Sequence, residues 1–346
     1  MDGIIRGSKV SVEFEVVMLM RKRMVVFLGS LCLVASSVLA AGPGGAVFTD
    51  PAKAGEDYKI QGEYLGEIRT QDGSRRIGAQ VIALGGGKFN VIGHTGGLPG
   101  DGWSRGDDRN EIEVQAENGS LVFPVGDALV SLVDGKISVE YDGQLLGVME
   151  KIERKSPTLG IGPPKGGMVL FDGSGTDQFN DAELVDGKWL GATNVWSKEK
   201  FGDHHLHVEF RTPFMPEARG QARGNSGVYI QSRYELQVLD SFGLEGKDNE
   251  CGGIYSISQP DVNMCFPPLA WQTYDIDFTS ARYNADGEKT SNARVTIHHN
   301  GIVIHDDREL AHGTPGRHGE GPELDSLFLQ NHGNPVVFRN IWVVKK

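Results

Sequence analysis

The 346-residue sequence has few cysteines, no apolar run long enough to cross a membrane, and no basic cluster beyond its N-terminal region. Its net charge at pH 7 is −12. Nucleic-acid phosphates would be repelled by such a surface, so the charge argues against a nucleic-acid partner. No Rossmann, P-loop or zinc-protease motif occurs either, which removes the sequence basis for those nucleotide and metal sites.

Helical periodicity is also scarce. The 48 glycines and the many short alternating runs predict strands joined by tight turns. A hydrophobic share of 39% and a charged share of 23% are ordinary for a soluble protein with an apolar core. We therefore predict an all-β protein.

The N-terminal region has the pattern of an export signal. Basic residues at 21–23 precede an apolar run at 25–34, and Val38 and Ala40 fit a small-residue cleavage site. The run is too short for a transmembrane helix, which needs about 20 residues. A lipoprotein cleavage site needs a small residue directly before its cysteine, and Leu31 before Cys32 is too large, so we expect no lipid anchor. We expect residues 1–40 to hold a signal peptide with extra residues upstream, and the protein to be periplasmic or extracellular; the alternative is a buried N-terminal helix.

A proline- and glycine-rich segment, 156–167, divides the remaining chain. Residues 42–155 contain short alternating runs and predict a small β-rich accessory domain. Residues 168–346 contain longer runs with one polar face, such as 206–211, and predict two packed sheets in a β-sandwich or jelly roll. His299-Asn300-Gly301 predicts a hairpin turn, because asparagine and glycine tolerate positive φ.

The segment 223–243 is the most informative part of the chain. It predicts two adjacent strands in which alternate side chains point to opposite faces. One face is apolar and carries Val228, Ile230, Leu236 and Val238, whereas the other carries Tyr229, Gln231, Glu235 and Gln237. Carboxylate, amide and phenol groups together suit a surface that binds a polyhydroxylated ligand.

Seven short motifs carry a family resemblance. They are Arg-Gly-Asn-Ser-Gly-Val-Tyr (223–229), Arg-Tyr-Glu-Leu-Gln-Val-Leu-Asp-Ser (233–241), Glu-Cys-Gly-Gly-Ile-Tyr (250–255), Trp-Gln-Thr-Tyr-Asp-Ile-Asp (271–277), His-Asn-Gly (299–301), Leu-Gln-Asn-His-Gly (329–333) and Phe-Arg-Asn-Ile-Trp (338–342). In this order they resemble the 3-keto-disaccharide hydrolase domain family over about residues 167–346. The resemblance implies a concanavalin-like β-sandwich that acts on glycosides already oxidised to a ketone at sugar C3.

Three residues are the catalytic candidates. Glu235 lies on the polar face and Asp240 follows the same strand, and a pair of carboxyl groups is the usual apparatus of glycosidic chemistry. His332 ends the Leu-Gln-Asn-His-Gly motif, and its imidazole can transfer a proton or bind a metal. The alternative for Glu235 is a structural ion pair with Arg233 or Arg211.

The remaining candidates would bind substrate. They are Arg223, Asn225, Tyr229, Gln231, Gln237, Tyr255 and Gln330. A guanidinium at Arg223 could polarise a ketone, and a divalent metal held by residues from different strands is the alternative. Cys251 and Cys265 could form a disulfide in an oxidising compartment, or stay as buried free thiols.

These features predict an exported enzyme that cleaves 3-keto-glycosides or disaccharides. A C3 ketone acidifies the proton on C2, so elimination across C1 and C2 followed by hydration would give net hydrolysis. Direct displacement by two carboxylates is the rival route. The alternative function is a non-catalytic carbohydrate-binding module on a lectin-like sandwich, because a fold does not fix a function.

Overall fold

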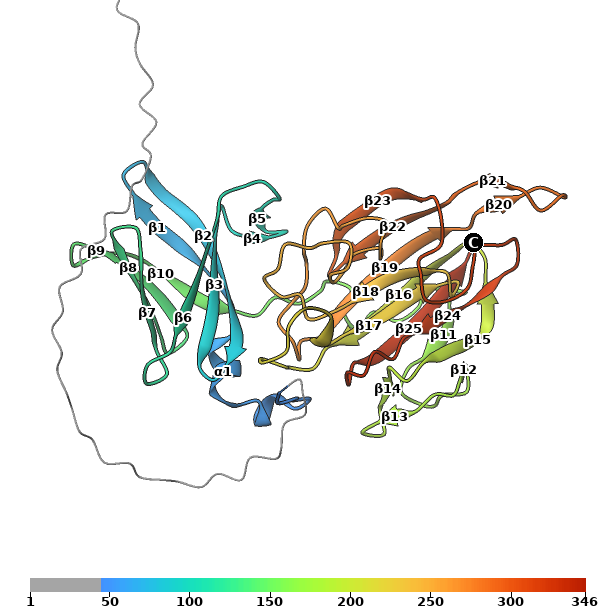
Figure 1. Ribbon diagram of the computed structural model, residues 1–346, viewed down its shortest axis with the longest axis horizontal. Coiled ribbons are helices and arrows are strands. Elements are labelled where there is room, and N and C mark those ends of the chain that lie inside the picture. Colours follow the sequence, from blue (N-terminus) through green and yellow to red (C-terminus); the bar gives the residue numbers. More distant parts are fainter. Residues whose placement is uncertain (1–44) are drawn as a thin grey trace, which may run out of the picture. The chain divides into compact units, whose positions relative to one another are not determined.

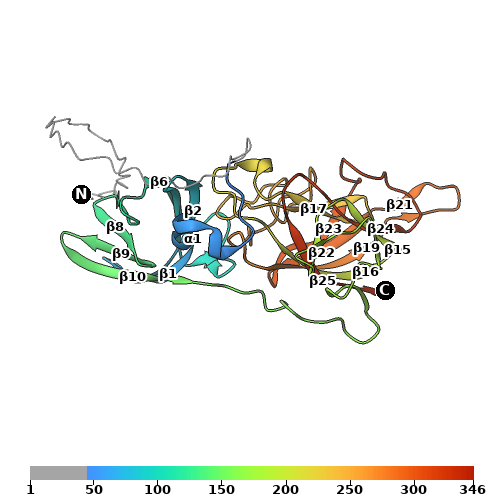
Figure 2. The same ribbon diagram turned by 90° about the horizontal axis from the view of Figure 1, so that it is seen from below.

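A computed structural model describes residues 45–346. The predicted signal peptide lies outside the described residues. Almost all regular structure is strand, as Figures 1 and 2 show; the helical elements in the described part are α1 (Gly55–Ile60) and two 3₁₀ turns, Pro51–Lys53 and Gly220–Ala222. None of these helices is long and apolar enough to span a bilayer. The predicted all-β class is therefore confirmed.

The N-terminal sheet has eight antiparallel strands. Their order in the sheet is β6-β3-β2-β1-β10-β9-β8-β7. The strands are β1 (Gly62–Thr70), β2 (Gly73–Gly85), β3 (Lys88–Thr95), β6 (Arg109–Gln115), β7 (Leu121–Val125), β8 (Ala128–Val133), β9 (Lys136–Tyr141) and β10 (Gln144–Ile152), with a small pair formed by β4 (Leu98–Pro99) and β5 (Gly102–Trp103). The two edge strands, β6 and β7, are consecutive in the chain and contact each other, so the sheet curls toward a closed barrel.

The C-terminal half is a β-sandwich. Its larger sheet contains, in order, β13 (Leu184–Val185), β14 (Trp189–Gly191), β25 (Val337–Lys345), β16 (His204–Arg211), β19 (Gln272–Thr279), β22 (Ala293–His299) and β23 (Ile302–Leu310), and β11 (Met168–Phe171) also pairs with β25. Its second sheet contains β12 (Phe179–Asn180), β15 (Val195–Phe201), β24 (Asp325–Leu329), β17 (Ser226–Ile230) and β18 (Tyr234–Val238). A separate hairpin pairs β20 (Arg282–Tyr283) with β21 (Lys289–Ser291). The predicted sandwich is thus confirmed.

Alternation along the strands produces the sandwich core. Val228 and Leu236 of the smaller sheet and Leu206, Val208 and Ile276 of the larger one are all fully buried in one apolar cluster. Because the polar residues between them point to the other faces, the outer face of β17 and β18 is left for a polar site.

The two sheet systems share apolar contacts. Ile82 and Ile92, from β2 and β3, belong to the sandwich cluster, whereas Phe214 and Leu269 of the sandwich half pack into the N-terminal cluster. Each half therefore has its own core but also completes the other one. This interlocking goes beyond the sequence expectation of an accessory domain on a linker.

Segment 156–167 contains no strand, and it is held along the outer face of the larger sheet. The hydroxyl of Thr158 donates to Asp275 at 2.6 Å, and the backbone N–H of Gly160 donates to Glu209 at 2.5 Å. The indole N–H of Trp342 donates to the carbonyl of Ile161 at 2.9 Å. The segment predicted as a linker is consequently a bound strap in this region.

Candidate functional site

The β17–β18 hairpin positions the central residues of the site. Gln231 and Ser232 have φ of +49° and +51°, which is the backbone of a tight hairpin turn. The turn pairs Tyr229 with Glu235 across the two strands. Since directly paired residues project to the same face, these two side chains meet on the outer surface of the sheet.

A cavity of about 220 Å³ lies over this face. It is lined by Gln221, Asn225, Tyr229, Glu235, Gln237, Tyr255, Pro315, Gly316, Gln330 and His332. Seven of the ten residues predicted for catalysis or substrate binding are in this set: Asn225, Tyr229, Glu235, Gln237, Tyr255, Gln330 and His332. The cavity is small, and eight of the ten residues that line it carry an amide, hydroxyl, carboxyl or imidazole group.

Glu235 is the ionisable centre of the cavity. Its side chain is almost completely buried, with 4% exposure for the residue. The Tyr229 hydroxyl donates to Oε2 at 2.8 Å. Burial raises the pKa of Glu235 to about 7, and the hydrogen bond from Tyr229 opposes this rise only in part. Glu235 can therefore both accept and release a proton at neutral pH.

Gly227 makes room for this carboxylate, a role that the sequence interpretation missed. A Cβ at this position would lie 2.5 Å from Oε1 of Glu235 and 3.0 Å from Cε2 of Tyr229. A glycine inside a strand often marks a close approach, so the Ser-Gly-Val-Tyr run did contain a signal. Gln221, Pro315 and Gly316 were also missed, and no local pattern in the sequence marks them as part of a site.

Replacing Gly227 with alanine is expected to slow about 10²-fold any reaction in which Glu235 transfers a proton, because a displacement of about 1 Å at a reacting group has an effect of that order. The added methyl group must push the Glu235 carboxylate out of its place. Steady-state kinetics of G227A would measure the loss, and Gly175→Ala is the matched control because nothing lies within 4 Å of its Cβ. Wild-type kinetics in G227A would contradict the assigned position of Glu235.

Amide groups surround the carboxylate. Gln237 donates to Oδ1 of Asn225 at 2.8 Å, and Asn225 donates to the carbonyl of Gln221 at 2.8 Å. Gln330 donates to the Tyr229 hydroxyl at 3.2 Å, while its own buried Oε1 has no hydrogen-bond partner in the described part of the chain. A buried carbonyl oxygen without a partner is costly, so a ligand hydroxyl would complete the site.

Tyr255 and His332 form the more open part of the lining. Tyr255 is half-buried, and its backbone N–H donates to the carbonyl of Glu235 at 3.1 Å. His332 is exposed at the rim, beyond the end of β24. The aromatic ring and the imidazole are therefore accessible to a ligand that reaches the buried carboxylate.

The structure places Arg223 and Asp240 away from this cavity. Arg223 Nε lies 2.6 Å from Oδ2 of Asp240, and both side chains are buried. Arg223 also donates to the carbonyl of Ala83 in β2 at 3.1 Å. This buried ion pair joins the segment before β17 to the segment after β18. We therefore assign it a structural role, in place of the predicted substrate contact of Arg223 and the predicted catalytic role of Asp240.

Gln231 also points elsewhere. Its side chain donates to the carbonyl of Phe201 at 2.7 Å and to the Ser280 hydroxyl at 3.0 Å, and it lines a different cavity. The strand alternation that predicted its direction stops at Ile230, where the turn begins.

Of the two alternatives for the cysteines, the structure has the free thiols. Cys251 and Cys265 are free, buried thiols in the structure, and the Cys251 sulfur lies 3.2 Å from the Tyr274 hydroxyl.

The described residues contain no cluster of metal ligands. Across residues 45–346, no three His, Cys, Asp or Glu side chains are grouped so that they could hold a metal ion. The cavity itself contributes one carboxylate and one imidazole.

Comparisons with known proteins identify the family of the C-terminal half. Residues 166–344 match the model of the 3-keto-alpha-glucoside-1,2-lyase-like domain family. A structure from Parabacteroides distasonis, described as a candidate glycosyl hydrolase, is 28% identical, covers 54% of this chain and 86% of its own, and has a TM-score of 0.50. A second structure with the same description and organism is 18% identical, with coverage of 53% and 94% and a TM-score of 0.39. No curated protein matches the chain.

Proposed function

The chain belongs to the 3-keto-alpha-glucoside-1,2-lyase-like domain family, and we propose that it is an exported enzyme that cleaves glycosidic bonds of 3-keto-glycosides. The observation that carries this proposal is the buried Glu235, whose pKa is raised to about 7 by burial. A carboxyl group that titrates near neutrality is suited to general acid–base catalysis. A module that only bound sugars would need aromatic rings and amides but no such group.

Elimination is the route that one such base supports. The C3 ketone acidifies the C2 proton, and the Glu235 carboxylate takes this proton. The electron pair of the C2–H bond forms the C1–C2 double bond, and the C1–O bond breaks, so the leaving oxygen needs a proton. Water then adds across the double bond, with oxygen at C1 and hydrogen at C2, and the net reaction is hydrolysis.

Residues around Glu235 would stabilise the negative charge that develops on the enolate and on the leaving oxygen. Burial, together with the adjacent Glu235, raises the pKa of Tyr229 well above its usual range, so its hydroxyl keeps the single proton that it donates to Oε2 of Glu235. Once Glu235 has taken the C2 proton, this hydroxyl can donate to the developing enolate instead. We assign the protonation of the leaving oxygen to His332, which lines the rim of the cavity. The unpartnered Oε1 of Gln330 is suited to accept a sugar hydroxyl.

The test is to incubate the mature protein with 3-keto-trehalose or 3-keto-lactose and to measure released sugar. The reactions are run with added divalent metal and with a chelator, and the unoxidised disaccharides are the control substrates. We expect release only from the keto sugars. No release under any of these conditions would instead assign the domain as a binding module.

The same reaction in deuterated water distinguishes the two routes. Elimination followed by hydration is expected to leave deuterium at C2 of the product, because the base exchanges its proton with the solvent. Direct displacement leaves the C2 hydrogen untouched. Mass spectrometry and proton NMR of the product would measure the label, and an unlabelled C2 would overturn the elimination route.

A further inference from the structure

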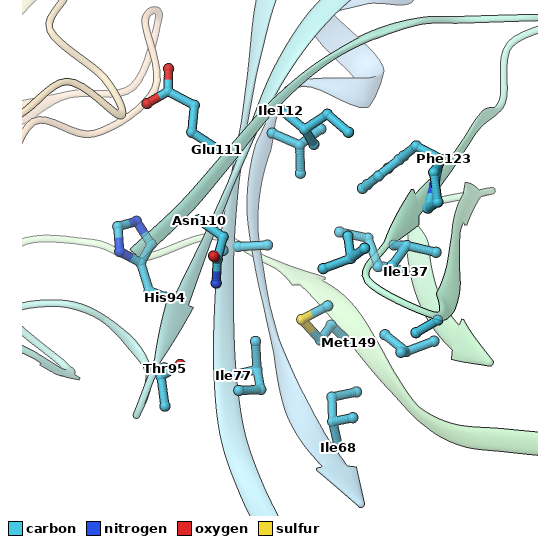
Figure 3. Close-up of a pocket in the computed structure, with 18 residues that line it drawn as sticks. Ile68, Ile77, His94, Thr95, Asn110, Glu111, Ile112, Phe123, Ile137 and Met149 are labelled. Atoms are coloured by element: carbon cyan, nitrogen blue, oxygen red, sulfur yellow. The ribbon is translucent and has the colours of Figure 1, made fainter. Parts of the chain in front are cut away.

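The N-terminal sheet encloses a second cavity, unrelated to the Glu235 site. Its volume is about 420 Å³, and all eight strands of the sheet contribute to its lining. Figure 3 shows Ile77, Ile137 and Met149 pointing toward a common space from different strands. The cavity is therefore the interior of the curled sheet, formed by the side chains that alternate inward.

One end of this interior is filled and the other is open. On β1, β2 and β3, the residues Tyr64, Val81 and Phe89 are fully buried at the filled end. Toward the opposite end of the sheet, Ile68 of β1 and Ile77 of β2 line the cavity. Protein interiors are otherwise close-packed, so an apolar space of this size that opens to solvent has the character of a ligand-binding pocket.

Part of the cavity exists because residue 93 is a glycine and has no side chain. Gly93 lies within β3 and lines the cavity, and an ideal Cβ built there meets nothing within 4 Å. A β-branched residue would fit the space and would favour the strand. A glycine in a strand interior often marks a place where a ligand approaches closely.

The chemistry of the walls restricts the ligand. Glu111 lines the cavity, yet Figure 3 shows its side chain on the opposite side of β6, and it is paired with Arg109. Inward positions near the open end carry the neutral side chains of Thr95 and Asn110. Val125, on the neighbouring hairpin, is 44% exposed and gives the opening an apolar lip. A charged group would lose its hydration in such a cavity without gaining a partner.

We propose that this cavity is a binding site for a small uncharged molecule with an apolar body of two rings and one hydroxyl group. An apolar cavity of about 150 Å³ holds one benzene, so a cavity of about 420 Å³ has room for a body of two rings together with a hydroxyl group and its surroundings at the open end. The hydroxyl group would remain at the open end, where the Thr95 hydroxyl and the Asn110 amide can bond it. The site is independent of the glycoside-cleaving function proposed above.

The proposal is tested with 2-naphthol as the probe, titrated calorimetrically into the full protein. We expect saturable binding at one site per chain, and binding at least tenfold weaker for 2-naphthalenesulfonate, which has the same rings and a charge. The Glu235→Gln variant should bind 2-naphthol as the wild type does. No saturable binding of 2-naphthol, or equal binding of the sulfonate, would overturn the proposal.

Filling the cavity provides the second test. Gly93→Leu is expected to weaken 2-naphthol binding at least tenfold and to raise the melting temperature, because the leucine occupies the void. Ala128→Leu, at the half-buried edge of the cavity, tests the same point if Gly93→Leu does not fold. Undiminished binding by a folded variant would contradict the site. If the wild type is a dimer and Gly93→Leu is a monomer, the cavity is occupied by a second copy of the chain, and this result would also overturn the proposal.

Discussion

Replacing Glu235 with glutamine is expected to reduce turnover by about 10²–10⁴-fold, the range that general acid–base catalysis contributes. Glutamine keeps the size of the side chain and can still accept the hydrogen bond from Tyr229, which lies 2.8 Å from Oε2. What it removes is the proton transfer. Loss of turnover with unchanged substrate affinity would therefore identify Glu235 as the base, whereas retained turnover would contradict its role.

The pH dependence of catalysis follows from the same group. Only ionised Glu235 can take the C2 proton, and its pKa is raised to about 7 by burial. We expect kcat/KM to increase with pH and to level off above about 7. A profile that is flat between pH 5 and pH 8 would show that another group is the base.

Stability should respond in the opposite direction. A raised pKa in the folded state means that Glu235 favours folding in its protonated form and opposes folding once it is ionised. The pKa of Glu235 rises from 4.5 to about 7 on folding. At about 1.4 kcal/mol per unit of pKa, this rise corresponds to a change of roughly 3 kcal/mol in the free energy of unfolding between low and high pH. This contribution is fully present below pH 4.5 and is lost as the pH rises through 7.

The E235Q variant should consequently equal the wild type in stability near pH 4 and exceed it by up to about 3 kcal/mol near pH 9. Urea unfolding at a series of pH values would measure the difference. Glu67→Gln is the control, because Glu67 lies on an exposed position of β1. A stability difference that does not change with pH would contradict the buried, protonatable state of Glu235.

Replacing Asp240 with asparagine is expected to destabilise the fold by about 3–5 kcal/mol, the usual cost of removing one partner from a buried ion pair. The side chains of Arg223 and Asp240 are only 6% and 1% exposed, so the remaining guanidinium would stay buried without a counter-charge. One nitrogen of Arg223, Nη2, already lacks a partner in the described structure. The large effect on stability should come with a small effect on catalysis, since neither residue lines the cavity.

Urea unfolding and kinetics well below the melting temperature would separate these two effects. The double variant Arg223→Met with Asp240→Leu is expected to recover much of the lost stability, because it removes both buried charges together. An Asp240→Asn variant with normal stability and lost turnover would overturn the structural role and restore Asp240 as a catalytic group.

The sequence by itself determined the strands and the face on which the central residues lie. The alternation of Tyr229, Glu235 and Gln237 with apolar neighbours has a period of two, and this period is a local property of a strand. The family resemblance likewise needed only short motifs. The match over residues 166–344 confirms that part of the interpretation.

The tertiary structure decided which groups meet and how deeply they are buried. Gln330 and Gly316 reach the cavity from segments far along the chain, and Gly227 had to be seen beneath the Glu235 carboxylate before its role was clear. Asp240 shares a motif with Glu235, yet it pairs with Arg223 instead. Burial, which sets the pKa of Glu235, is a sum over neighbours from many segments, and for this reason no local pattern could predict it.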